Sequence, residues 1–79
     1  MKIAAIKQLI SQYSLVELRK AEEDLLEERN PIIDLGPDEP GDQLTHAIAA
    51  IQILEEVAKG VDEKTALRNF TQRVRNSIN

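Results

Sequence analysis

Residues 44–58 read LTHAIAAIQILEEVA, and this stretch decides the fold. At about 100° per residue, one side of the helix that it would form carries an apolar seam: Leu44, Ala47, Ile51, Leu54 and Ala58. A second, largely apolar face flanks this seam: His46, Ala50, Ile53 and Val57. A surface helix needs an apolar stripe of only about 100°. We therefore expect this helix to bury both faces, either at the centre of its own bundle or with one face against a second copy.

Two helices are expected before this stretch. Apolar residues at spacings of three and four predict a first helix at about residues 2–12. Ser14, followed three residues later by Glu17, has the capping-box pattern, in which the two side chains satisfy opposite ends of a first helical turn. This pattern predicts a second helix at about residues 15–29. The helix should end before Pro31, which lacks a backbone N–H and disfavours helical geometry in the residue before it.

Residues 30–42 are expected to form an irregular connector, because they contain all three prolines and two of the three glycines. Apolar residues within this segment, Ile32, Ile33 and Leu35, indicate that it packs across the bundle. Asp42 is the expected N-cap of the central helix, at about residues 43–59, because acidic side chains are favoured at exposed helix amides.

Gly60 and Asp62 separate the central helix from the last one. Gly60 suits the left-handed position that ends a helix, and Asp62 suits the N-cap of a helix at about residues 63–77. The buried stripe of this helix should be Leu67, Phe70, Val74 and Ile78. The fold class is therefore all-α, a small three- to four-helix bundle with an irregular Pro/Gly-rich connector between helices 2 and 3. Its length of 79 residues allows one core, so residues 1–79 should form a single helical domain.

Several classes of protein are disfavoured by the composition. The chain has no cysteine, so it cannot use disulfides, thiol chemistry or a thiolate metal site. The longest nearly uninterrupted apolar run, residues 47–54, is far shorter than the roughly 20 residues that cross a bilayer. We expect a cytoplasmic protein that does not associate with a membrane. Three scattered glycines form no phosphate-binding loop, and no pattern indicates a small-molecule substrate or a cofactor.

Charge is distributed unevenly along the chain, whose net charge is −4. All fourteen acidic residues lie between Glu17 and Glu63, where only four basic residues oppose them. Residues 1–16 contain two lysines and residues 64–79 contain four basic residues, with no acid in either segment. We expect the basic ends to lie against the acidic middle, within one fold or across a dimer.

Acidic helix 2 suggests one catalytic alternative, a metal-dependent hydrolase. Glu23 and Glu27, or Asp24 and Glu28, stand one helical turn apart and offer oxygen ligands for a hard cation. The chain contains no second acidic motif that matches them, and a solvated, partly neutralised face explains the acids equally well. His46 is the only histidine, and no nucleophile stands at a recognisable spacing from it. We therefore expect a protein that is not an enzyme, with no catalytic residues and no metal ligands.

A second alternative comes from residues 60–68, GVDEKTALR. They are similar to the turn and recognition helix of helix-turn-helix repressors, where a Gly-Val turn precedes a Thr, a small apolar residue and an Arg. This resemblance implies DNA binding, with Lys64, Thr65, Arg68 and Asn69 facing the major groove and Arg73 and Arg75 near phosphates. The resemblance departs at Glu56, four residues before the glycine, where those repressors carry a small residue. The chain is acidic overall, so nucleic acid is not the partner that we expect.

The leading hypothesis is a small interaction module of unknown role that self-associates or receives a partner helix. The surface that it predicts is the second apolar face of the central helix: His46, Ala50, Ile53 and Val57. One short chain offers few elements to cover two faces of the same helix. We therefore expect a homodimer or another homo-oligomer, or a complex in which a partner helix covers that face.

Overall fold

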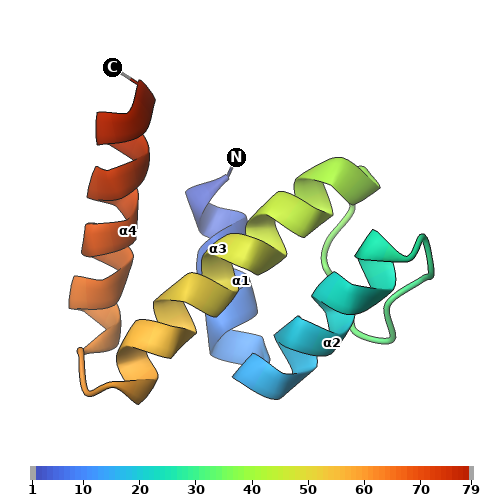
Figure 1. Cartoon of the computed structure of the whole chain (residues 1–79), viewed down its shortest axis with the longest axis horizontal. Helices are drawn as coiled ribbons and strands as arrows, with labels where there is room; N and C mark the ends of the chain where they lie inside the picture. The colour runs from blue at the N-terminus through green and yellow to red at the C-terminus, as the bar shows by residue number, and fades with distance from the viewer. Residues whose placement is uncertain (1, 79) are drawn as a thin grey trace.

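The central helix of the sequence is also the central helix of the structure, a computed structural model that describes residues 2–78 and side chains as far as residue 76. This helix, α3 (Pro40–Ala58), packs against α1 (Ile3–Gln12), α2 (Leu15–Leu26) and α4 (Glu63–Ile78). Across the described residues, Cα atoms of no other helix pair come within 8 Å of each other. Figure 1 shows α2 and α4 on opposite sides of α3. The described residues hold no strand, so the prediction of an all-α bundle is confirmed.

The junction between α1 and α2 has the predicted capping box. Ser14 Oγ accepts a hydrogen bond from the Glu17 N–H at 3.2 Å, and Glu17 Oε1 accepts one from the Ser14 N–H at 2.9 Å. These bonds satisfy backbone donors at the start of α2 and set its direction away from α1. Tyr13 stands at the junction, and its hydroxyl accepts a hydrogen bond from the Asp34 N–H of the connector.

Helix α2 ends at Leu26, three residues earlier than the sequence indicated. Glu28 takes a left-handed conformation with φ of 58°. The Arg29 N–H then donates to the Asp24 carbonyl at 2.7 Å, and the Glu28 N–H donates to the Leu25 carbonyl at 3.1 Å. This is a Schellman motif, in which glycine usually occupies the left-handed position. A glutamate at the left-handed position does not mark the end of a helix in the sequence. The predicted end of this helix therefore relied on Pro31 alone.

Helix α3 begins at Pro40, before the expected start, and Asp42 is not its N-cap. Proline suits the first helical position because the N–H group that it lacks would have no hydrogen-bond acceptor within the helix there. Glu39 is the N-cap residue and makes no side-chain capping bond. Asp42 lies in the first turn instead, where a negative charge is favoured by the exposed backbone amides.

The turn between α3 and α4 follows the prediction closely. Gly60 has φ of 100°, and the Val61 N–H donates to the Glu56 carbonyl at 3.1 Å in a second Schellman motif. Asp62 caps α4 by accepting hydrogen bonds from the Lys64 and Thr65 N–H groups. Of the predicted buried stripe, Phe70 is 6% exposed, whereas the side chain of Ile78 lies outside the described residues.

The core forms where α1, α2 and α4 meet α3. Its buried members include Ile6 and Leu18, both with no exposed surface, and Phe70 of α4. The connector contributes Leu35, which is 4% exposed, as expected for a segment that packs across the bundle. Ile32 was expected to pack in the same way and is 92% exposed.

Candidate functional site

The face predicted for self-association, made of His46, Ala50, Ile53 and Val57, is not a free surface. His46 is 1% exposed, and Ala50 and Ile53 have no exposed surface within a single chain. Val57 is partly buried and packs against the same core. Three helices pack on α3, so both of its apolar faces are covered inside the fold. This corrects the expectation that a second copy or a partner helix covers that face.

His46 belongs to a small polar cluster with Lys2 and Asp38. The Lys2 backbone N–H donates to His46 Nε2 at 3.1 Å, so neutral His46 carries its proton on Nδ1. Nδ1 lies 4.0 Å from Asp38 Oδ2 and has no hydrogen-bond partner among the described residues. Lys2 Nζ lies 2.6 Å from Asp38 Oδ1. This hydrogen bond holds the pKa of the Asp38 carboxyl below its usual range and raises the pKa of Lys2. The cluster ties the start of α1 to the connector and to α3.

Three of the six α4 residues assigned to DNA are engaged within the protein. The Thr65 hydroxyl donates to the carboxylate of Asp62, the residue that caps α4. Asn69 Nδ2 donates to Glu56 Oε1 at 3.3 Å, and Arg73 Nη1 donates to Glu56 Oε2 at 2.9 Å. These bonds, the one from Arg73 first, lower the pKa of the Glu56 carboxyl. Glu56, the departure from the repressor pattern, therefore binds the side chains that the resemblance would direct toward DNA.

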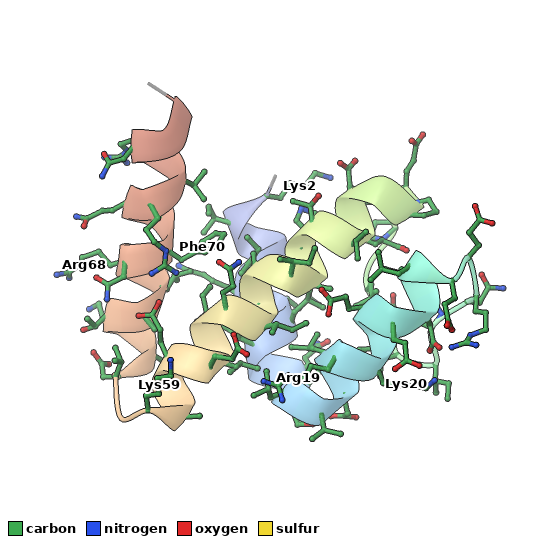
Figure 2. All side chains as sticks on the ribbon, in the orientation of Figure 1. Lys2, Arg19, Lys20, Lys59, Arg68 and Phe70 are labelled. Atoms are coloured by element: carbon green, nitrogen blue, oxygen red, sulfur yellow. The ribbon has the colours of Figure 1, made fainter. Side chains whose placement is uncertain are left out.

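The other three basic residues of α4 line a groove. Lys64, Arg68 and Arg75 line a hollow of about 350 Å³, to which α1 contributes Ile3 and Lys7. Leu67, Thr71 and Gln72 complete its lining, and we call it the α1–α4 groove. In Figure 2, Arg68 projects outward from α4. The groove therefore combines four cations, two apolar side chains and two neutral polar groups.

The basic residues of α4 form a stripe along the groove. Lys64, Arg68 and Arg75 are separated by four and seven residues, so they share one side of the helix. At 1.5 Å per residue, the stripe runs for about 16 Å, or about three turns. All three side chains are exposed, as is Lys7 across the groove. A linear array of cations faces any molecule that lies parallel to α4.

These four cations have no acidic partner. No Asp or Glu lines the groove, and none of the four makes an ion pair with any described residue. Of the basic residues at the two ends of the chain, only Lys2 and Arg73 form ion pairs with acids that the structure describes. The expectation that the basic ends lie against the acidic middle within one fold is therefore correct for these two alone. Acidic α2 lies on the far side of α3 from α4 (Figure 1).

Three of the four acids that suggested a hydrolase, Glu23, Asp24 and Glu27, pair with neighbouring cations, whereas Glu28 makes no ion pair with the described residues. Arg29 Nη2 lies 3.0 Å from Asp24 Oδ1 and forms further ion pairs with Glu23 and Glu27. Lys20 Nζ donates to Asp24 Oδ1 at 3.1 Å, and this bond, followed by the bond from Arg29, lowers the pKa of Asp24. Among the described residues, no three His, Asp or Glu side chains are grouped as they would be in a metal site. The acids instead form a salt-bridge network at the end of α2.

Two other hollows lack the charge of the α1–α4 groove. One hollow lies between α1 and the connector. Its volume of about 80 Å³ is well below the roughly 300–1,000 Å³ of ligand pockets. The other, of about 330 Å³, lies between the end of α2 and the start of α3. Its charged lining residues are Glu28 and Arg29, so their charges balance. The α1–α4 groove is therefore the candidate functional site.

Sequence reasoning identified three of the four cations of this site. It assigned Lys64, Arg68 and Arg75 to a binding surface but missed Ile3 and Lys7, which α1 contributes. The available signal was the acid-free N-terminal segment, in which the one-turn spacing of Ile3 and Lys7 places them on the same side of a helix. Nothing in the spacing shows that this side faces α4.

The model of a family of unknown function (DUF6952) matches residues 1–79, and the chain belongs to this family. No curated protein and no solved structure matches the chain. None of the helices in the described part of the chain is long and apolar enough to cross a membrane.

Proposed function

We propose that this member of DUF6952 is a small interaction module that binds an acidic segment of a partner protein in the α1–α4 groove. The observation that carries the proposal is the set of unpaired cations, Lys7, Lys64, Arg68 and Arg75, on a chain whose net charge is −4. Surface charges of one sign with no partner steer an oppositely charged molecule and set its orientation. The function class remains the one expected from sequence, with a different surface.

The lining of the groove favours a protein over nucleic acid as the partner. Ile3, 37% exposed, and Leu67 supply apolar surface in the same lining as the four cations. A protein segment can offer apolar side chains beside its acids, whereas a phosphate backbone cannot. Thr65 and Asn69, which would contact bases in a repressor, are already hydrogen-bonded to Asp62 and Glu56. Both observations support an acidic protein segment.

The same lining supports binding without catalysis. Among the described residues that line the groove, only Thr71 has a hydroxyl, which donates to the Leu67 carbonyl at 2.9 Å. The groove contains no histidine, aspartate or glutamate that could act as a general base beside it. We therefore assign the groove no chemical step.

The test compares two charge reversals in a binding titration. The probe is a fluorescein-labelled peptide of glutamate and leucine, and the variants are Arg68→Glu in the groove and Lys59→Glu at the end of α3. Both residues are exposed, and Figure 2 shows both. Arg68→Glu replaces an attraction of up to about 1 kcal/mol by a comparable repulsion, so we expect about a tenfold loss of affinity. Lys59→Glu should change the affinity less than about twofold.

Equal losses in the two variants would contradict the proposal, because they would show attraction to total charge alone. A mixed-sequence DNA duplex in the same salt is the second probe. Tighter binding of the duplex than of the peptide, abolished by Arg68→Glu, would replace the proposal with the nucleic-acid alternative.

A further inference from the structure

We infer that the acidic segment binds as an amphipathic α-helix that lies along α4 in the α1–α4 groove. This inference rests on the function proposed above and specifies the form of its partner. It is carried by three features of the groove: the separation of its walls, the spacing of its cations and the position of its apolar side chains.

The separation of the walls suits a helix. Helices α1 and α4 each pack against α3, yet no Cα atom of one comes within 8 Å of the other in the described chain. Helices in direct contact have axes about 8–10 Å apart and bring many Cα atoms closer than this. The hollow of about 350 Å³ is therefore flanked by two helices whose backbones stay apart. A helix that lies along α4 there would contact lining residues of both walls.

The spacing of the cations matches one side of a helix. Lys64, Arg68, Thr71 and Arg75 lie at intervals of four, three and four residues along α4. A second helix alongside α4 presents its own side chains at the same intervals, so its acids can meet these groups turn by turn. An extended peptide would point successive side chains to opposite sides and advance about 3.3 Å per residue. Only alternate residues of such a peptide could face α4.

Each wall contributes an apolar side chain beside its cations. Lys7 stands on α1, the α4 cations stand on the other wall, and Ile3 and Leu67 lie in the lining with them. This arrangement predicts a partner helix with a narrow apolar stripe and acidic residues along both of its edges. The stems of lysine and arginine can cover the edges of that stripe while their charged ends reach the acids. Binding of an amphipathic helix in a groove is an established mode of peptide recognition.

The inference is tested with three peptides of identical composition, each about 14 residues of glutamate, leucine, alanine and one proline. In the first, leucines share one helical face and the proline lies at the first helical position, where it is tolerated. In the second, the leucines are distributed around the helix. In the third, the proline lies at the centre and prevents a continuous helix. We expect the first peptide to bind at least about tenfold more tightly than the others, and circular dichroism to show a gain of helix on mixing.

A matched pair of protein variants tests the apolar contact. Ile3→Gln, in the groove, should weaken binding of the first peptide about three- to tenfold and bring its affinity toward that of the other two. Val16→Gln is the control, because Val16 is 75% exposed on α2 and lies outside the groove. It should leave the affinity unchanged. Equal effects of the two substitutions would overturn the assigned apolar contact and with it the amphipathic helix.

The outcomes separate this inference from the proposed function. Equal binding of all three peptides, lost in Arg68→Glu, would overturn the helical form of the partner and retain acidic recognition. No binding of any peptide would overturn both. A salt-sensitive oligomer that is dissociated by Arg68→Glu in sedimentation, without peptide, would identify a second copy as the occupant and overturn a separate partner helix.

Discussion

Glu28 holds a backbone conformation that costs the folded chain free energy, and replacing it with glycine should stabilise the protein. Its φ of 58° places it in the left-handed region, which costs an L-residue about 1–2 kcal/mol. Its side chain is exposed and makes no hydrogen bond or ion pair with the described residues. Glycine removes this steric cost. It also raises the conformational entropy of the unfolded chain, which destabilises the fold by about 0.4–1 kcal/mol. The expected gain is about 0.5–1 kcal/mol.

In a domain of this size, 1 kcal/mol shifts Tm by about 4–8 °C, so Glu28→Gly should raise Tm by about 2–8 °C in a thermal melt followed by circular dichroism. Glu28→Ala is the matched control, because it removes the same carboxylate and keeps a Cβ at the left-handed position. It should give no comparable gain. If Glu28→Ala raises Tm as much as Glu28→Gly, the stabilisation comes from the lost charge, and the account of the Schellman motif at the end of α2 is refuted.

Two further predictions concern the core and the carboxylates. Ile53→Ala should lower the free energy of unfolding by about 2–5 kcal/mol, because Ile53 has no exposed surface, whereas Val57→Ala should cost less. Urea denaturation should give the same midpoint at low and high protein concentration, and a concentration-dependent midpoint would place Ile53 at an interface between copies. Hydrogen bonds lower the pKa of four carboxyls in the folded chain, namely Asp24, Asp38, Glu56 and Asp62. These carboxylates therefore stabilise the fold at pH values above their pKa in the unfolded chain, which is about 4. This stabilisation is lost as the pH falls through their pKa values in the folded chain. Stability should decline below about pH 4, less steeply in Asp24→Asn, and an increase in stability on acidification would contradict these directions.

The features that sequence reasoning predicted correctly are local. The capping box of Ser14 and Glu17, the left-handed Gly60 and the Asp62 cap each depend on residues within about one helical turn, whose geometry is nearly independent of the remaining chain. The error at the end of α2 is also local. It arose because a glutamate occupies a position where glycine would have been the signal.

The apolar periodicity of residues 44–58 determined that this helix buries two faces. Only the tertiary structure decided what covers them, because burial against the chain's own helices and burial against a second copy require the same apolar pattern. The face of His46 and Ile53 lies inside the chain. Tertiary packing likewise placed Lys7 and Arg68 in the lining of one hollow, through contacts of α1 and α4 with α3. The sequence supplied the cations, and the packing of α1 and α4 on α3 placed them in one groove. Spacing along one helix carries no information about which helix lies beside it.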